Sequence, residues 1–414
     1  MPASSEPQTA LLHFTGRDHP GITASLTALL AESNAEVLDI GQAVVHENLT
    51  LGILIQVSDF PAFETTLLHR VEQLGLHPTI TLVASGQSPT LRPDHFVITV
   101  LGRAISAGHI AQVSTIIAKY GMNVDRIDRL SSSLTGASDA AQTPINACIE
   151  FAISGDLTQE APMRADLLAA AQTFSVDIAF QRESIFRRNR RLFAFDMDST
   201  IIQAEVIDEL AKMAGVGEQV SRITESAMRG EIQFDESFSR RVALLKGLPA
   251  ERVYSLLGAI PLAVGAERLF RTLKLLGFKT AILSGGFNFF ARSLQERFDI
   301  DHVHSNELEI VDGVVTGRVI PPIINGDRKA QLLGEIAAVE GISLEQVVAV
   351  GDGANDIPML NMAGMGIAYR AKPLVRQQAD QSISRLGLDG LLYLIGVRDR
   401  DLAEHQAQTE TGAA

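Results

Sequence analysis

The sequence has little cysteine, no long apolar run and a shortage of positive charge. Cys148 is the single cysteine among 414 residues, which excludes an internal disulfide and fits a reducing cytoplasm. No run of about 18 apolar residues occurs, so a membrane-spanning helix is not expected. Residues 1–8 are polar and lack the cationic and apolar pattern of a secretory signal. These absences predict a cytoplasmic protein that does not enter a membrane.

Acidic residues outnumber basic ones, with 49 Asp and Glu against 35 Lys and Arg and a net charge of −14. Nucleic acids and anionic membranes attract basic surfaces, so neither is an expected partner. The exception is residues 182–191, which contain five arginines. This stretch could contact RNA or form a solvated connector between domains, and its acidic surroundings favour the connector.

The first half of the chain repeats one pattern of predicted elements. Residues 10–84 predict the order β-α-β-β-α-β, and residues 95–181 predict the same order again. A linker rich in Ser, Gly and Pro, residues 85–94, separates the two copies, and residues 134–144 form a loop-like insert in the second. The repeat predicts two ferredoxin-like units.

These two units resemble ACT domains, small modules that commonly bind amino acids and pair through sheets or helices. The loop from Gly16 to Ile22 matches the family's ligand-loop pattern. In the second copy, residues 102–108, the loop between the glycines is one residue longer than between Gly16 and Gly21, and the Asp and Pro are absent. The resemblance implies an amino-acid effector, such as serine, and a homodimer. It gives Gly16, Asp18 and Gly108 as candidate ligand residues. A purely structural dimerisation module is the alternative.

A pair of aspartates follows a short apolar run in the second half. The run Leu192–Phe195 predicts a buried strand, and Asp196 and Asp198 come directly after it, followed by two hydroxyl residues. Ligands of parallel α/β sheets bind at this end of the strands. Two carboxylates at this spacing suit magnesium-dependent phosphoryl transfer, with one as nucleophile and one as acid and base. A solvated turn that caps a helix is the bland alternative.

Two further predicted strands deliver polar residues at the same edge. Residues 280–283 end in Ser284, Gly285 and Gly286, and residues 346–350 end in an acidic loop that contains Asp352 and Asp356. Ser284 and the Gly285 N–H can donate to phosphate oxygens. From residue 191 onward, strands and helices alternate. The fold predicted here is α/β, with a doubly wound, mainly parallel Rossmann-like sheet.

The remaining charged residues complete the expected site. Asp352 would hold Mg²⁺ together with Asp196 and the backbone carbonyl of Asp198. Asp356 could hold a metal-bound water or orient the metal ligands. Lys329, which opens a predicted helix, would offset the charge of Asp196 and of the transferring phosphoryl group.

This set of residues, in this order, resembles the haloacid dehalogenase superfamily. Its nucleophile motif matches at Asp196, its Ser/Thr motif at Ser284, its lysine at Lys329 and its acidic motif at residues 352–356. The resemblance implies that Asp196 forms an aspartyl-phosphate, which water then hydrolyses.

Helical sequence interrupts the α/β alternation over about residues 201–264 and predicts a small cap over the strand ends. Glu205 lies shortly after the nucleophile and could accept a substrate cation. Arg240 and Arg241 lie in a predicted cap helix, and either could pair with a substrate carboxylate. An anion acceptor opposite a cation acceptor suits a zwitterionic amino-acid substrate.

The stretch from Asp196 to Leu248 resembles phosphoserine phosphatases, and the similarity extends through residues 192–395. In that family's pattern, Glu205 receives the serine ammonium and Arg241 the carboxylate. Met228 and Phe234 would close the pocket, and Asn355 would contact phosphate or substrate.

The resemblance implies hydrolysis of O-phospho-L-serine, the last step of serine biosynthesis, with amino-acid regulation through the ACT domains. A phosphatase or phosphotransferase for another phospho-amino acid or for protein phosphoserine is one alternative, and an amino-acid-sensing regulatory protein is another. The expected domains are ACT domain 1 (1–88), ACT domain 2 (89–182), a phosphatase domain (183–398) and a flexible tail (399–414).

Overall fold

A computed structural model describes residues 7–83, 94–132, 147–229, 231–403 and 405. The chain forms two compact units, which divide between Leu91 and Arg92. Most of the predicted linker, the insert at 134–144 and most of the tail from Glu404 onward lie outside the described residues. Within the described residues, no helix is long and apolar enough to cross a membrane.

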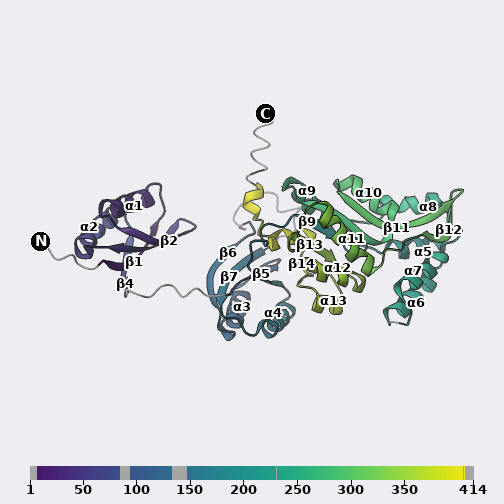
Figure 1. Ribbon diagram of the computed structural model, residues 1–414, viewed down its shortest axis with the longest axis horizontal. Coiled ribbons are helices and arrows are strands. Elements are labelled where there is room, and N and C mark those ends of the chain that lie inside the picture. Colours follow the sequence, from purple (N-terminus) through teal and green to yellow (C-terminus); the bar gives the residue numbers. More distant parts are fainter. Residues whose placement is uncertain (1–6, 84–93, 133–146, 230, 404, 406–414) are drawn as a thin grey trace, which may run out of the picture. The chain divides into compact units, whose positions relative to one another are not determined.

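The first unit is a four-stranded antiparallel sheet with two helices (Figure 1). Buried and less buried side chains alternate along its central strand β3, which places Leu49, Leu51, Ile53 and Ile55 on the face that packs against both helices. The sheet order is β2-β3-β1-β4, as expected for a ferredoxin-like unit. Its elements are β1 Gln8–Arg17, α1 Ile22–Glu32, β2 Glu36–Val45, β3 Asn48–Val57, α2 Phe60–Gln73 and β4 His77–Val83.

The second unit begins with a sheet of the same topology, in the order β6-β7-β5-β8. Its helix α3 starts with a capping box, in which Ser106 and His109 each accept a hydrogen bond from the other's backbone N–H. The predicted repeat is therefore confirmed. Its elements are β5 Asp94–Gly102, α3 Ala107–Lys119, β6 Asn123–Arg129, β7 Ala147–Gly155, α4 Glu160–Phe174 and β8 Asp177–Arg182.

Edge strand β8 joins this domain to the large sheet that follows. The Gln381 amide accepts from the Phe180 N–H and donates to the Phe180 carbonyl, at 2.8 Å in each case. The Asp177 carboxylate accepts the backbone N–H groups of Ser384 and Arg385 at 2.9 and 2.8 Å. The Gln381 bonds satisfy the backbone groups of Phe180 at the edge of the sheet, and the Asp177 bonds satisfy backbone donors that follow β15.

The arginine-rich stretch is more than a solvated connector, and that expectation is wrong for Arg187. Its side chain is fully buried and forms an ion pair with Glu150 of β7, which is itself buried. Arg190 donates to the carbonyl of Glu345, and burial lowers its pKa to about 10. A buried charge requires a partner, and Glu150 supplies it from the preceding domain.

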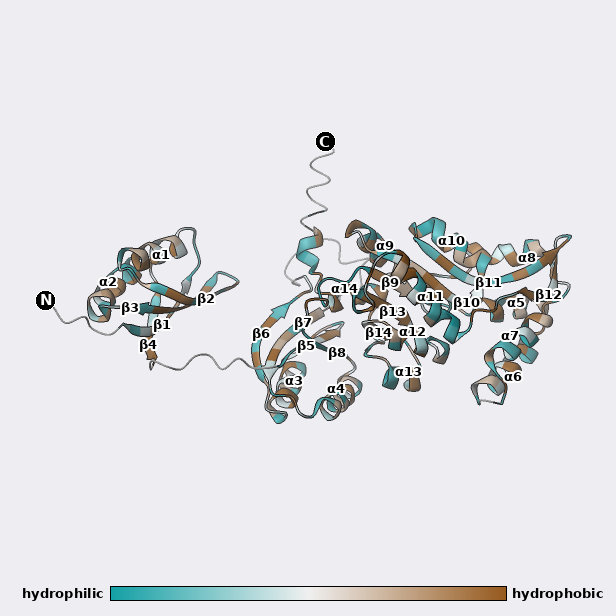
Figure 2. Cartoon of the chain, in the orientation of Figure 1, coloured by the Kyte–Doolittle hydropathy of each residue, from teal (hydrophilic) through white to brown (hydrophobic). Residues whose placement is uncertain are grey.

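The third sheet has seven strands in the order β12-β11-β10-β9-β13-β14-β15. All neighbouring pairs are parallel except β11 with β12. Central strand β9 is buried on both faces, which explains its continuous apolar run: Leu192 and Ala194 face α11 and α12, whereas Phe193 and Phe195 face α9 and α10. In Figure 2, brown segments mark the apolar parts of this sheet, whereas the hairpin strands β11 and β12 mix brown with teal.

The remaining elements complete this layered α/β domain and its cap. The elements that precede β10 in the chain are β9 Leu192–Phe195, α5 Val206–Ala214, α6 Gly217–Met228, α7 Phe234–Ala243, α8 Ala250–Tyr254, the 3₁₀ helix η1 Ser255–Gly258 and α9 Ala266–Leu275. Those that follow are β10 Lys279–Phe287, α10 Asn288–Phe298, β11 His302–Val311, β12 Val314–Ile320, α11 Gly326–Val339, η2 Leu344–Gln346, β13 Val347–Gly351, η3 Ala354–Asp356, α12 Ile357–Met362, β14 Met365–Tyr369, α13 Pro373–Gln378, β15 Gln381–Ile383, η4 Leu388–Gly390 and α14 Leu391–Leu394.

The predicted cap is present as helices α5 to α8 between β9 and β10. Hairpin strands β11 and β12, which the sequence analysis did not identify, support this cap. The Gly247 N–H donates to the Val315 carbonyl, and the Val315 N–H donates to the Leu248 carbonyl, both at 2.9 Å. The antiparallel edge of the sheet therefore carries one side of the cap.

The ordered fold extends past residue 398, where the predicted tail begins. The Asp399 carboxylate binds the Arg268 guanidinium at 2.6 Å and the Tyr393 hydroxyl at 3.0 Å. It also accepts the Ser132 N–H at 2.9 Å. The expectation of a flexible tail is therefore wrong at Asp399, because three partners hold its side chain.

Candidate active site

The carboxyl ends of β9, β10 and β13 bring three predicted site residues to one edge of the sheet. Asp196 follows β9, Ser284 lies in the last part of β10, and Asp352 follows β13. The Asp196 N–H donates to the Val350 carbonyl of β13 at 2.9 Å, which fixes the start of the nucleophile loop against the neighbouring strand. Adjacent parallel strands end together, so these side chains converge.

Lys329 lies at the centre of the buried charges. Its ammonium is 2.9 Å from Asp196 Oδ1 and 2.7 Å from Asp356 Oδ1, and its side chain is fully buried. Burial alone would lower the pKa of Lys329, but Asp196 and Asp356 raise it above its ordinary value. The lysine is therefore a fixed positive charge beside the predicted nucleophile.

Both oxygens of Asp356 are engaged within the protein. Oδ1 binds Lys329, and Oδ2 accepts the backbone N–H groups of Asp352 and Gly353 at 3.1 and 2.9 Å. A side chain on Gly351 would overlap the Asp356 carboxylate, because a Cβ there would collide with Oδ2. Of the two predicted roles, this geometry supports orientation of the Asp352 loop.

The loop after Asp196 folds tightly around one carbonyl. Met197 O accepts the N–H groups of Thr200, Ile201 and Ile202, and the Thr200 hydroxyl donates to Asp352 Oδ1 at 3.2 Å. Asp198 is buried, and its Oδ1 has no hydrogen-bond partner among the described residues. A buried carboxylate oxygen without a partner is costly, so this atom is placed for an exchangeable proton or a ligand.

Asp196, Asp198 and Asp352 have strongly raised pKa values. Burial raises the pKa of Asp196 to about 7, and the charge of Asp356 adds to this while Lys329 opposes it. Burial, together with Asp196 and Asp356, raises the pKa of Asp352 to about 8. Burial and then the charges of Glu205 and Asp196 raise the pKa of Asp198 well above its ordinary value. One lysine does not balance this set of carboxylates.

The residues present fit a bound cation. Carboxylate oxygens of Asp196, Asp352 and Asp356 lie within 4.8 Å of one another. Hard cations take such oxygen ligands, and a cation would favour the ionised carboxylates that burial alone disfavours. The acidic cluster could therefore hold a metal ion beside Asp196.

The Ser-Gly-Gly segment of β10 is shaped by close packing. The Gly286 N–H donates to Ser284 Oγ at 2.9 Å, and a Cβ on Gly286 would lie 2.6 Å from Asp198 Oδ2. A Cβ on Gly285 would lie 3.1 Å from the Phe234 ring of the cap. A side chain at Gly286 would therefore overlap Asp198, whereas one at Gly285 would require the Phe234 ring to shift slightly.

Asn306 of β11 also belongs to this site, although the sequence analysis did not identify it. Its side chain is buried, donates to the Gly285 carbonyl and accepts the Ile324 N–H, at 2.8 Å in each case. It thereby joins the Ser-Gly-Gly segment to Ile324, which directly precedes the N-cap residue of α11, the helix that carries Lys329. No local motif marks this asparagine, because both partners are distant in sequence.

The remaining predicted residues lie in the cap and in the loop that follows β13. Glu205 precedes α5, and its carboxylate accepts the Ser199 hydroxyl at 2.8 Å. Asn355 lies half-buried in η3, in the loop of Asp352 and Asp356. Met228 ends α6, and its side chain lies outside the described part of the structure.

The two candidate arginines of α7 differ in environment. Arg240 is exposed and forms an ion pair with Glu236 at 2.5 Å. Arg241 is half-buried, and among the described residues its guanidinium has no ion pair within 4 Å. Burial lowers its pKa, and the more distant charges of Asp208 and Glu205 offset this only in part. Arg241 is therefore the guanidinium that is available to a ligand.

Comparison with known proteins identifies the family of this site. Residues 193–361 match the haloacid dehalogenase-like hydrolase family. The chain is 41% identical over 394 residues to phosphoserine phosphatase SerB2 of Mycobacterium tuberculosis, which covers 94% of this chain and 93% of that one. The chain belongs to the phosphoserine phosphatase family. A Streptomyces coelicolor phosphoserine phosphatase is 40% identical over 402 residues and covers 95% of this chain and 93% of its own.

A solved structure of a probable phosphoserine phosphatase from Vibrio cholerae supports the fold of this family member. It superposes with a TM-score of 0.58 at 30% identity, over 74% of this chain and 87% of that one. Residues 8–81 and 94–181 each match ACT domain families, so the two repeats are ACT domains.

The candidate ligand residues of the ACT domains lie at the ends of first strands and in the following turns. Gly16 lies close to the loop that contains Gly75 and Leu76. A Cβ at position 16 would lie 2.7 Å from Leu76 Cδ2 and 3.1 Å from Gly75 O. This packing explains Gly16 without a ligand. Asp18 is exposed, and Gly108 is exposed in the first turn of α3.

Proposed function

We propose that this protein hydrolyses O-phospho-L-serine to L-serine and phosphate in a magnesium-dependent reaction through an aspartyl-phosphate. The observation that carries the proposal is the buried Asp196–Lys329–Asp356 group beneath a cap that offers Arg241 to a ligand. The family relatives support the same substrate by name.

Asp196 is the nucleophile in this proposal. Its carboxylate attacks phosphorus, a bond forms between Asp196 and phosphorus, and the bond from phosphorus to the serine oxygen breaks. Lys329, fixed 2.9 Å from Asp196, stabilises the charge on the transferring phosphoryl group. Asp196, Asp352 and the backbone carbonyl of Asp198 would hold Mg²⁺, which would supply further neutralisation of the phosphoryl charge.

Asp198 moves the proton in both halves of the reaction. Its raised pKa favours the protonated acid, which donates to the departing serine oxygen. The resulting carboxylate then takes a proton from the water that attacks the aspartyl-phosphate. A bond forms between the water oxygen and phosphorus, the bond between Asp196 and phosphorus breaks, and phosphate leaves, which returns Asp196 and Asp198 to their starting states. Asp198 Oδ1, which has no hydrogen-bond partner among the described residues, supports this role.

The cap and strand ends bind the rest of phosphoserine. Arg241 binds the substrate carboxylate, and Glu205 the ammonium group. The phosphate contacts are assigned to Ser284, the Gly285 N–H and Asn355. Phe234 packs over Gly285, and with Met228 it closes the pocket.

The ACT domains extend the proposal to regulation. We assign them an amino-acid effector, with serine as the first candidate, at Gly16, Asp18 and Gly108, and a role in homodimer formation. The reaction then forms the last step of serine biosynthesis. A single free cysteine, buried in β7, suits the cytoplasm.

Phosphate release from L-phosphoserine tests the proposal, with Mg²⁺ or with EDTA. We expect Asp196→Asn to lower kcat at least about a thousandfold, because the nucleophile is lost. Arg241→Ala should lower kcat/KM by about a hundredfold, the typical cost of truncating one partner of a buried charge pair.

Arg240→Ala is the matched control, because it removes the neighbouring exposed guanidinium and should change kcat/KM less than about threefold. Turnover of phosphothreonine or phosphopeptides in preference to phosphoserine would overturn the substrate. Absence of all turnover would favour an amino-acid-sensing protein.

A further inference from the structure

One asparagine side chain joins the core to the cap. Asn325 caps the amino end of α11: its Oδ1 accepts the Arg328 N–H at 3.0 Å. Its Nδ2 donates to Asp235 of cap helix α7, 3.1 Å from Oδ1 and 3.3 Å from Oδ2. The two ends of one amide therefore meet a core backbone donor and a cap carboxylate.

The core end of this contact is tied to the catalytic lysine. The Lys329 N–H donates to the Asn325 carbonyl at 2.9 Å, as part of the first turn of α11. Ile324, directly before Asn325, donates its N–H to buried Asn306, which also holds the Gly285 carbonyl. These hydrogen bonds therefore hold Asn325 in a fixed position relative to Lys329 and to the Ser-Gly-Gly segment.

The cap end lies beside two substrate-binding residues. Asp235 occupies the first turn of α7, next to Phe234, which packs against Gly285. Arg241 lies in the last turn of the same helix. A displacement of α7 that broke the Asn325–Asp235 contact would also move Phe234 and Arg241 from the phosphate-binding residues.

The contact has the strength expected of a reversible closure. Asp235 is exposed and Asn325 is half-buried. A hydrogen bond from a neutral amide to a partly solvated carboxylate contributes about 1 kcal/mol net. Such a bond can stabilise a closed cap and still break each time product leaves.

We propose that the hydrogen bond between Asn325 and Asp235 acts as a latch, which holds the closed cap in place against α11, the helix that carries Lys329. Asn325 is then a positioning residue for substrate binding. This inference rests on the proposed function for its kinetic consequence. Asparagine suits the position because its side-chain carbonyl caps α11 while its NH₂ reaches the cap carboxylate. An ionised aspartate caps a helix equally well but has no hydrogen to donate to Asp235.

Exchange of the two partners tests the latch. Asn325→Asp keeps the helix cap but sets two carboxylates against each other, so KM for phosphoserine should rise about three- to tenfold, with kcat changed less than about twofold. The double variant Asn325→Asp with Asp235→Asn restores a donor facing an acceptor, with the two groups exchanged. It should return KM to within about twofold of wild type.

A second readout does not depend on the substrate. Amide hydrogen exchange over residues 234–243 should quicken in Asn325→Asp and return toward the wild-type rate in the double variant. If the wild-type protein does not hydrolyse phosphoserine, the rate of amide hydrogen exchange still tests whether the Asn325–Asp235 bond holds α7 in place. An unchanged KM and exchange rate in Asn325→Asp, or a double variant as impaired as the single one, would overturn the proposal.

Discussion

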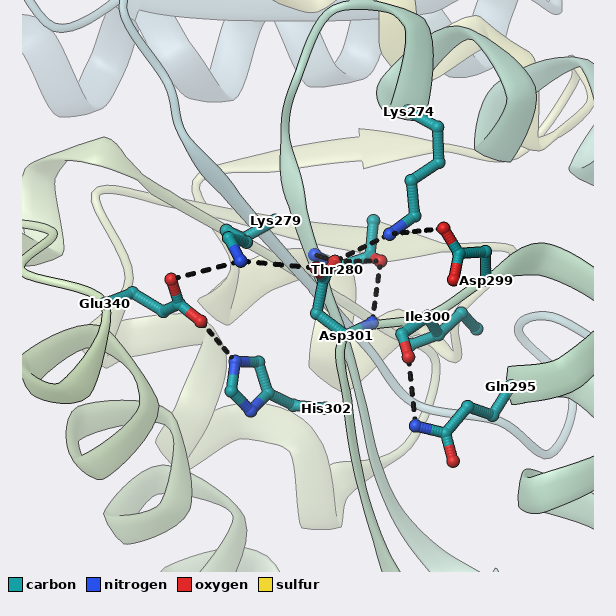
Figure 3. A network of polar contacts seen from close by, with 9 residues as sticks. All are labelled: Lys274, Lys279, Thr280, Gln295, Asp299, Ile300, Asp301, His302 and Glu340. Atoms are coloured by element: carbon teal, nitrogen blue, oxygen red, sulfur yellow. Dashed lines mark hydrogen bonds and ion pairs between the residues drawn. The ribbon is translucent and has the colours of Figure 1, made fainter.

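The two edges of the seven-stranded sheet, at the carboxyl and amino ends of its parallel strands, differ in how their acidic side chains are paired with basic ones. At the carboxyl edge, the carboxylates of Asp196, Asp352 and Asp356 share one lysine. At the amino edge, where β10 and β11 begin, two lysines and a histidine contact three carboxylates (Figure 3). The first edge has fewer basic than acidic side chains, whereas at the second each of these carboxylates contacts a basic side chain.

The pKa values follow this difference. At the carboxyl edge, burial raises the pKa of Asp196 to about 7 and that of Asp352 to about 8. At the amino edge, burial also acts to raise the pKa of Asp301, but Lys274 and Thr280 lower it to about 2. His302 and Lys279 lower the pKa of Glu340. The amino edge pairs its charges, as expected for stability, whereas the carboxyl edge keeps raised carboxylate pKa values, as expected at a functional site.

The largest expected effect comes from exchanging a lysine at each edge. Lys329→Met should lower kcat/KM by about 100- to 1,000-fold, because the ammonium that lies against Asp196 is lost. Lys274→Met should leave kcat/KM within about twofold of wild type, since it lies at the opposite ends of the strands. Steady-state phosphate release measures both. Similar losses in the two variants would show that the comparison between the edges is wrong.

The local strand-end motifs were predictable because each follows its strand directly in sequence. An apolar run followed by Asp196, by Ser284 or by the Asp352 loop is enough to indicate a residue at the carboxyl edge of a parallel sheet. Lys329 was also found, since the family resemblance gave its place. The two ACT repeats were also predictable, from the periodicity of apolar residues in their strands and helices.

The supporting contacts were not predictable because they join residues that are distant in sequence. Asn325 and Asp235 are separated by 90 positions, and Arg187 and Glu150 by 37. An exposed-looking arginine run gives no sign that one member will be buried on a neighbouring domain. Such pairs depend on how the sheets pack, which periodicity does not report.

Removal of metal should reveal the shortage of positive charge at the carboxyl edge. The folded-state pKa values of Asp196 and Asp352 lie above the ordinary 3.8, so the folded chain binds more protons than the unfolded chain between about pH 4 and 8. In EDTA, Tm should therefore be highest at the acidic end of this window and fall as pH rises through 7 to 8. Thermal unfolding followed across this range measures the slope.

Magnesium should oppose that fall, because it competes with protons for the same carboxylates. We expect the increase in Tm on adding Mg²⁺ to be larger at pH 8 than at pH 5. Asp352→Asn is the control, since it removes one of the titrating groups and should flatten the slope in EDTA. A Tm that rises with pH in EDTA would contradict the assignment of raised pKa values.

The smallest expected effect is at the amino edge. Asp301 accepts the Thr280 N–H at 2.9 Å and the Lys274 ammonium at 2.8 Å. Asp301→Asn should lower the free energy of unfolding in urea by about 1–3 kcal/mol, as expected when hydrogen bonds to a charged group are lost. Phosphoserine turnover should be unchanged, because the residue lies at the other end of the sheet.

Asp299→Asn tests whether stability at this edge depends on the bonds of Asp301 or only on the total charge. The Asp299 side chain is 96% exposed and lies 3.6 Å from the same Lys274 ammonium. This variant removes the same unit of charge as Asp301→Asn, yet the free energy of unfolding should change by less than about 0.5 kcal/mol. Equal losses in the two variants would mean that the amino edge is stabilised by its overall charge. A loss confined to Asp301→Asn would mean that the partly buried bonds of one carboxylate hold the two strands in place.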